Sequence, residues 1–549
     1  MKRLLRLEPM DLIFFLYLVL YFGFSMTTLV SFPFVHSDES WLSALTRDMM
    51  AQGSFSVTES SFDLYPREPH AIKTLFHLMQ MPLFLAFGYS VGSARLLSLL
   101  CSILALLVFY LVVRSLEGPG PERLLAVLFP IFLSLDAQFL YAAHFARQEM
   151  VLLLLQMILI YLRVSPGKDQ KPWYRTLVPS AVLLGISIGI HPNSFLLAAA
   201  FLSYDLFQAF RNRIPLRQPL VLLGATGLSA LGYVLLSFWM NPDFLRDYLT
   251  YGATLGVTAS PLDKVLGVIP FVQKLFYQIS GTYYTPDIRW FLLLIPVAFL
   301  IVLVLTFTSK MDRLDPSRRT SGLAELALIL MVMTLFAIMV IGRYSQPSIL
   351  FLYPSGYLLI FLMFQTGERF RRLIPESHSP RLVSLGILSG LILLGAISLP
   401  VTGKEMAQQA QAGPAYQAYL ERIQEVVPRD AKVLGNLNAD YAFDQGALLD
   451  YRNLGLLEQE GLSFADYVRS RGIQFILYPS EMDLIYQQRP IWNDMYGNLY
   501  PYYEEMQEFL GKDCDLLDQF PTPYAMRIAR RFPDDQAVLT IYQVKAAQK

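Results

Sequence analysis

His36-Ser37-Asp38-Glu39-Ser40 follows directly after the first long apolar stretch of the chain, residues 10–33. Two adjacent acids beside a membrane helix are costly in contact with lipid, so we expect them to face water, a partner or a site. The side of the membrane on which Asp38 and Glu39 lie therefore decides how the rest of the chain is interpreted.

The composition is that of a membrane protein. Of the 549 residues, 54% are hydrophobic and 16% are charged, and the mean hydropathy is +0.41. These values exclude an ordinary soluble enzyme of this length. Lys and Arg together number 44, as do Asp and Glu, so the net charge says nothing about partners. We expect membrane lipids as partners and no nucleic acid. Cys101 lies in an apolar segment and Cys514 in a polar one, so a disulfide between them is not expected.

Repeated apolar runs of membrane-spanning length predict eleven transmembrane helices. The expected spans are residues 10–33, 95–113, 123–141, 149–163, 176–190, 194–210, 218–239, 289–309, 322–341, 348–366 and 383–400.

The basic residues fix the predicted orientation. Twenty of the 44 Lys and Arg residues fall in the N-terminus and in five alternate connections, near residues 114–123, 163–175, 211–217, 310–319 and 369–381. The positive-inside rule places these segments in the cytoplasm. Because eleven spans are an odd number, the C-terminal segment is then extracytoplasmic. We expect a multi-pass protein of the plasma (inner) membrane.

Two further helices are predicted to lie at the outer interface of the first large loop, residues 34–94. Residues 75–92 are apolar but short and are interrupted by polar residues, so we interpret them as an interfacial helix. Residues 41–49 show apolar side chains at helical spacing with Arg47 and Asp48 on the opposite side.

The composition changes after residue 400, where long apolar runs end. We therefore predict two domains, a transmembrane domain at 1–400 and an extracytoplasmic soluble α/β domain at 401–549. Strand-like runs are expected at 431–437, 474–478 and 537–544, and helix-like runs at 416–426, 464–471 and 502–510. The chain shows no dinucleotide fingerprint, P-loop, nucleophile elbow, zinc motif or internal repeat.

Polar residues that could carry chemistry cluster on the predicted outer side. The clusters are Asp38-Glu39, residues 67–73 with His70 and Lys73, residues 144–149 with Arg147 and Glu149, residues 191–193 with His191, and residues 342–344 with Arg343. Each also has a structural interpretation. The acids could cap helices, the histidine turn could be hydrogen-bonded, and the cations could be snorkelling anchors.

The first loop resembles a known family. The run from Asp38 to Phe55 is similar to the first outer loop of GT-C membrane glycosyltransferases, in the branch of protein O-mannosyltransferases and lipid A aminoarabinose transferases. In that branch an acidic pair precedes an interfacial helix that ends in Gly and an aromatic residue. A Lys-Pro-Pro-like segment and a helix ending in Phe-Gly follow, and an Arg then enters the second span.

Other segments extend the resemblance. Lys73, Phe87-Gly88 and Arg95 match the elements of the first loop, although the two prolines after the lysine are absent. Ala146-Arg147-Gln148-Glu149 is similar to the family's Ala-Arg-x-acid turn, and Arg343-Tyr344-Ser345-Gln346-Pro347 to its Arg-Tyr-x-x-Pro element. His191 falls where many relatives have Lys-Gly.

The resemblance implies a hexosyl- or pentosyltransferase that moves a sugar from a polyprenyl-phosphate donor to an acceptor hydroxyl, with inversion. The acceptor could be a glycolipid, a polysaccharide or a protein. Asp38 is then the candidate base, and Glu39 is a candidate to orient it, to contact the acceptor or to serve as a second acid. Arg343, Lys73 and Arg147 are candidate cations for the donor phosphate. Glu149, His70 and His191 are candidates for binding the acceptor or a divalent metal, and the metal dependence stays open.

Two other classes of function compete with this interpretation. A transporter or lipid flippase would need ionisable residues within its spans, where the main exceptions to an apolar sequence are Asp136, Asp205 and Glu325. A structural membrane scaffold would leave the outer acids without a role. A transfer assay separates the enzyme from both.

Overall fold

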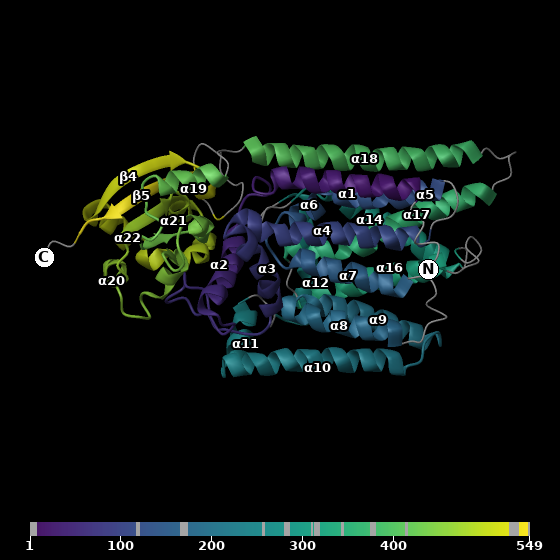
Figure 1. The fold of residues 1–549 in the computed structure, drawn as a ribbon, viewed down its shortest axis with the longest axis horizontal. Coiled ribbons are helices and arrows are strands. Elements are labelled where there is room, and N and C mark those ends of the chain that lie inside the picture. Colours follow the sequence, from purple (N-terminus) through teal and green to yellow (C-terminus); the bar gives the residue numbers. More distant parts are fainter. Residues whose placement is uncertain are drawn as a thin grey trace.

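The computed structural model describes residues 8–116, 121–164, 174–254, 259–278, 286–308, 311, 319–341, 345–373, 380–411, 416–525, 527 and 537–546. It consists of a long helical bundle with a smaller α/β domain at one end (Figure 1). The described N-terminal segment begins at the opposite end of the bundle.

Helices form in all eleven segments predicted to span the membrane. They are α1 (Pro9–Thr28), α4 (Val91–Arg114), α5 (Pro121–Ser134) with α6 (Ala137–Ala143), α7 (Glu149–Val164), α8 (Tyr174–Ile190), α9 (Ser194–Phe210), α10 (Arg217–Met240), α14 (Arg289–Phe307), α16 (Arg319–Ile341), α17 (Tyr353–Leu373) and α18 (Pro380–Gln411).

Seven described helices are long and apolar enough to cross a membrane, and an eighth candidate is the bent pair α5–α6. Helices α7, α8 and α9 have 16 or 17 residues and are short for a perpendicular crossing. Helices α10 and α18 lie along the two edges of the bundle (Figure 1). Their most apolar windows are only 17% and 22% buried, as expected for lipid-facing helices. The chain is a polytopic membrane protein.

The third predicted span is not one helix. Residues 122–134 and 137–143 form two helices that meet at a bend of 66°. Asp136 begins the second one, where its side chain accepts hydrogen bonds from the backbone N–H groups of Gln138 and Phe139 at 2.9 and 3.3 Å. The carboxylate thus satisfies orphan donors that a continuous helix would not have.

The first large loop carries the two predicted surface helices, α2 (Ser37–Gln52) and α3 (Thr74–Phe87). Gly53 ends α2 in the left-handed conformation with φ of 60°, which favours glycine. Gly88 ends α3 three residues before α4 begins. Both helices lie between the bundle and the α/β domain (Figure 1).

The second large loop forms three short helices, α11 (Phe244–Thr254), α12 (Pro261–Leu266) and α13 (Val268–Phe276). A 3₁₀ turn, η2 (Gln346–Leu352), leads into α17. Helix α18 continues eleven residues beyond the predicted domain boundary at residue 400.

The α/β domain holds a five-stranded mixed sheet with strand order β2-β1-β3-β5-β4. The strands are β1 (Val433–Gly435), β2 (Leu448–Asp450), β3 (Phe475–Pro479), β4 (Cys514–Pro521) and β5 (Val538–Val544). Strand β1 pairs in parallel with β2 and β3, whereas β5 is antiparallel to β3 and β4. The helical elements are α19 (Tyr416–Gln424), α20 (Phe464–Ser470), α21 (Glu481–Gln488), α22 (Tyr500–Asp513), η4 (Leu437–Ala442), η5 (Tyr451–Leu456), η6 (Pro490–Tyr496) and η7 (Pro523–Ala525).

The α/β domain packs directly on the first loop. Arg47 of α2 donates two hydrogen bonds of 3.0 Å to the buried carboxylate of Asp440 and stacks 4.1 Å from the ring centroid of Tyr89. Asn453 is hydrogen-bonded to the backbone of Ser61, Leu64 and Tyr65. One apolar cluster contains residues of both parts. The position of α2 therefore depends on the last fifth of the chain.

Candidate functional site

The candidate site is built around the N-terminus of α2, where Asp38 and Glu39 occupy the first turn. His36 precedes the helix, and its Nδ1 accepts a hydrogen bond of 3.1 Å from the backbone N–H of Asp38. Glu39 accepts a hydrogen bond of 3.1 Å from the backbone N–H of His36 and so closes a capping box. Acids are favoured at a helix N-terminus, and this explains the local conformation of both residues.

Glu39 is buried in an ion pair with Arg95. Both carboxylate oxygens accept guanidinium hydrogen bonds of 2.7 Å, and neither side chain has exposed surface. The same carboxylate accepts a hydrogen bond of 2.9 Å from the backbone N–H of Ala146. Arg95 also donates to the carbonyl oxygens of Leu29 and Phe32. The pair of Glu39 and Arg95 thus links α2 and α4 to the segment after α1 and to the turn before α7.

Asp38 points to the same turn but remains accessible. Its Oδ2 accepts a hydrogen bond of 2.7 Å from Nη1 of Arg147, and 27% of its side-chain surface is exposed. Nη2 of Arg147 lies 3.1 Å from Oε1 of Glu149, whose side chain is 6% exposed. Two carboxylates therefore share one guanidinium. Asp38 is the more exposed of these two acids and the better placed for proton transfer.

The turn that carries Arg147 is anchored to helix α4. The hydroxyl of Ser98 on α4 donates a hydrogen bond of 2.7 Å to the carbonyl oxygen of Phe145. A small pocket beside this turn is lined by Gln138, Tyr141, Ala142, Phe145, Arg147, Glu149, Met150 and Pro347. The lining residue Pro347 belongs to η2, which follows Ser345, so the pocket lies between this turn and η2.

Lys73 and His191 lie at a second junction. The backbone N–H of Lys73 donates a hydrogen bond of 3.0 Å to the carbonyl oxygen of Gly189, which links the first loop to the end of α8. Lys73 has a φ of 102° and precedes α3. His191 is buried between α8 and α9, and its Nδ1 accepts a hydrogen bond of 3.0 Å from the backbone N–H of Asn193.

His70 packs against aromatic rings of α11, with its ring centroid 6.2 Å from that of Phe244 and 6.4 Å from that of Tyr248. Burial, reinforced by the charges of Lys73 and Arg67, lowers the pKa of His70 to about 3. The imidazole is therefore neutral at physiological pH. Arg343 lies outside the described residues.

The described residues contain no group of three or more His, Cys, Asp and Glu side chains arranged to hold a metal ion. Asp38 and Glu149 both pair with the guanidinium group of Arg147, and this shared cation holds the two acids together.

Comparison with known proteins shows the fold. The sequence matches no family model and no curated protein. The structure resembles ArnT from Cupriavidus metallidurans bound to undecaprenyl phosphate, with a TM-score of 0.52, 13% identity and coverage of 96% of this chain and 97% of that chain. It also resembles the archaeal oligosaccharyltransferase AglB from Archaeoglobus fulgidus in complex with an inhibitory peptide and a dolichol-phosphate.

The likeness to AglB has a TM-score of 0.52 and 12% identity, and it covers 93% of this chain and 73% of that chain. Both proteins belong to the GT-C superfamily of membrane glycosyltransferases. The chain therefore has the GT-C fold, as the residues of its first loop predicted.

Sequence reasoning missed the role of two arginines. Arg95 was expected only as a marker of the second span, whereas the structure pairs it with Glu39. A charged residue at the start of an apolar span is a usable signal, because it requires a counterion. Arg452 was not singled out, and nothing in its sequence neighbourhood indicates that it reaches the first loop.

Proposed function

We propose that this chain is an integral membrane glycosyltransferase that moves a sugar from a polyprenyl-phosphate donor to an acceptor hydroxyl with inversion. The observation that carries the proposal is the position of Asp38. It is a partly exposed carboxylate held by Arg147 at the N-terminus of α2, in a chain with the GT-C fold.

Asp38 is the proposed general base. A base for inverting transfer must reach the acceptor hydroxyl on the side opposite the leaving phosphate. The hydrogen bond from Arg147 orients the carboxylate of Asp38, and the 27% exposure of the Asp38 side chain makes it accessible to an acceptor. Glu39 is the proposed positioning acid, because its ion pair with Arg95 excludes it from solvent.

The leaving group is an anionic lipid phosphate, which requires cations. Arg343 and Lys73 are the proposed phosphate-binding residues. Arg147 already serves Asp38 and Glu149, so its proposed main role is to orient the base. Glu149, His70 and His191 remain proposed contacts for the acceptor or for a divalent metal. The site is proposed to be extracytoplasmic, with the N-terminus in the cytoplasm of a plasma (inner) membrane.

The contacts of the three acids within the predicted spans argue against the transporter alternative. Asp136 caps α6. Asp205 is paired with Arg163 at 2.8 Å, and Glu325 is paired with Arg213. Each of these acids therefore has a structural partner, whereas a substrate or proton pathway needs ionisable groups that change partners.

The test is transfer by the purified full-length protein from a radiolabelled polyprenyl-phosphate sugar. The acceptors are separate fractions of cell-envelope glycolipid, polysaccharide and protein. Release of polyprenyl phosphate with label on one fraction supports the proposal. Transbilayer movement of intact donor in proteoliposomes, with no label transferred by wild-type protein, contradicts it.

A further inference from the structure

Arg452 places a positive charge of the α/β domain against helix α2, which carries Asp38. It lies on η5, and its guanidinium carbon is 4.4 Å from the ring centroid of Trp41. Trp41 is on α2, one helical turn after Asp38. The charge of Asp38 acts to raise the pKa of Arg452, so the two groups lie within electrostatic range of each other.

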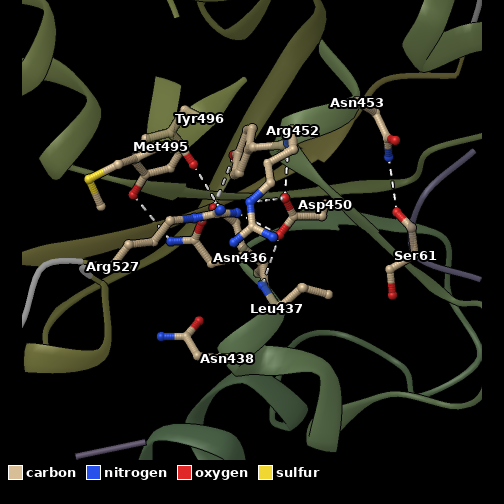
Figure 2. Close-up of polar contacts among 12 residues, drawn as sticks. Ser61, Asn436, Leu437, Asn438, Asp450, Arg452, Asn453, Met495, Tyr496 and Arg527 are labelled. Carbon is tan, nitrogen blue, oxygen red and sulfur yellow. Dashed lines mark hydrogen bonds and ion pairs between the residues drawn. The ribbon is translucent and has the colours of Figure 1, made fainter. Parts of the chain in front are cut away.

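The positive charge of Arg452 is only partly balanced by the negative charge of a neighbouring carboxylate. Its Nε is 3.8 Å from Oδ1 of Asp450, but Oδ2 of Asp450 is held at 2.5 Å by Nη2 of Arg527 (Figure 2). Two guanidinium groups thus share one buried carboxylate. Burial and the charge of Arg527 lower the pKa of Arg452, although Asp450 and Asp38 oppose this shift. The buried acid Glu481 lies on the Arg527 side, where it accepts a hydrogen bond from the Arg527 backbone.

One donor atom of Arg452 has no partner. Nη1 is buried and makes no hydrogen bond within the part of the chain that the structure describes. An unsatisfied buried donor on a charged group is costly, and a bound ion or polar ligand would satisfy it.

We propose that Arg452 binds an anionic group of the acceptor, a phosphate or a carboxylate, close to the hydroxyl that Asp38 deprotonates. The inference rests on the proposed function and adds the chemical class of the acceptor. Arg452 is a binding residue that selects the acceptor.

The assignment to the acceptor follows from the two sides of α2. Asp38 and Glu39 contact the bundle through Arg147 and Arg95, whereas Trp41 meets the α/β domain through Arg452. The hydrocarbon tail of a lipid donor must stay with the apolar bundle. The cation on the domain side lies away from the bundle that would hold the donor tail, and we therefore assign it to the acceptor. A guanidinium suits phosphate and carboxylate because it can donate two parallel hydrogen bonds.

The test uses full-length protein in phosphatidylcholine nanodiscs, saturated with polyprenyl phosphate. Inorganic phosphate is the probe for the anion site, titrated calorimetrically at constant ionic strength with chloride as the reference anion. Wild-type protein is expected to bind the probe. Arg452→Gln should bind it about tenfold more weakly or worse, since hydrogen bonds to charged groups carry most of such a site. Arg452→Lys should recover part of the loss, because the charge remains.

Arg469→Gln is the matched control. Arg469 is an exposed arginine of the same domain, 3.2 Å from Asp513, and its loss should leave probe binding unchanged. Equal binding of the probe by wild type and Arg452→Gln, or no binding by wild type, overturns the inference.

Two further outcomes separate the acceptor site from the donor site. If Arg452→Gln loses polyprenyl phosphate instead of inorganic phosphate, Arg452 belongs to the donor site and the inference is wrong, while the proposed function stands. If wild type binds inorganic phosphate through Arg452 but never binds polyprenyl phosphate, the anion site is supported and the proposed function fails.

Discussion

Glu39 and Arg95 form a bidentate ion pair with two hydrogen bonds of 2.7 Å and no exposed side-chain surface. The neighbouring acid, Asp38, keeps 27% of its side-chain surface exposed. Adjacent carboxylates on one helical turn are thus divided between a structural pair and an accessible group, and substitutions at the two positions should have different consequences.

Asp38→Asn should lower transfer by about 10²–10⁴-fold, the usual contribution of a general base, while the protein stays folded. The measurement is the initial rate of label transfer, with thermal unfolding to check stability. Asp243→Asn is the control, because the Asp243 side chain is 61% exposed and pairs with the exposed Arg246 at 3.4 Å. Near wild-type turnover by Asp38→Asn would exclude Asp38 as the base.

Glu39→Gln should destabilise the protein by about 3–5 kcal/mol, because it leaves the Arg95 charge buried without a counterion. A lower unfolding temperature in detergent measures this. The double variant Glu39→Gln/Arg95→Gln should recover part of that stability, since no lone charge remains. If the double variant is as unstable as the sum of the single variants, the two side chains are not energetically coupled.

Arg47→Ala should loosen the contact between the α/β domain and α2. The substitution leaves the carboxylate of Asp440, which is 1% exposed, without its guanidinium, at a cost of about 3 kcal/mol. We expect faster amide hydrogen exchange in residues 437–442 and 54–66. Lys512→Ala, at an exposed pair with Glu508 within one helix, should leave exchange there unchanged, and the same result for Arg47→Ala would contradict the packing role.

Low pH should destabilise the first loop, because it protonates the buried carboxylate of Glu59. Burial raises the pKa of Glu59, but the charge and hydrogen bonds of Arg67 outweigh burial and lower the pKa to about 2. Because the folded-state pKa lies below the ordinary value near 4.5, this stabilisation is present above about pH 4.5. It should fall by about 3 kcal/mol as the pH drops towards 2.

The comparison for this pH effect is Glu59→Gln, which should have a flatter dependence of unfolding free energy on pH between 4.5 and 2. Parallel pH profiles for wild type and Glu59→Gln would show that Arg67 does not hold the carboxylate in its charged form.

Arg343→Ala should weaken binding and use of the donor by about 100-fold, since one well-placed donor to a developing anion contributes roughly 3 kcal/mol. The measurement is the affinity for polyprenyl phosphate together with the transfer rate. Arg371→Ala is the control, because Arg371 pairs with Glu368 within one helix. Equal losses for Arg343→Ala and Arg371→Ala would argue against a phosphate site at Arg343.

The helical bundle could be predicted from the sequence because apolar length and the placement of basic residues are local properties. Every predicted span corresponds to a helix, although Asp136 breaks the third. The signal for that break was present as an acid inside an apolar run, since such an acid needs donors and a helix N-terminus supplies them.

The strands of the α/β domain were only partly predictable. Strands β1, β3 and β5 coincide with predicted runs because they are rich in apolar residues. Strand β2 has three residues, and β4 lies at the edge of the sheet with mostly exposed side chains. Strand β2 is too short to be identified as a strand from sequence, and β4 lacks the alternation of apolar and polar residues that would identify it.

The sequence indicated which residues belong to the candidate site, but it did not indicate which of their side chains pair with one another. The first-loop acids and Arg147 were singled out from the sequence, and the structure brings them together. The pairing of Glu39 with Arg95 and the approach of Arg452 to Trp41 depend on contacts between residues 56 and 411 positions apart. No local pattern encodes such contacts.

The hydrogen bonds of Asn453 to the backbone of Ser61, Leu64 and Tyr65 have a consequence for biosynthesis. The ribosome makes the first loop hundreds of residues before the segment that holds it in place. A nascent chain released before residue 453 would present Asp38 on a loop that lacks this support. Folding of the candidate site is thus coupled to completion of translation, and a chain truncated in its α/β domain should reach the membrane without the proposed transfer activity.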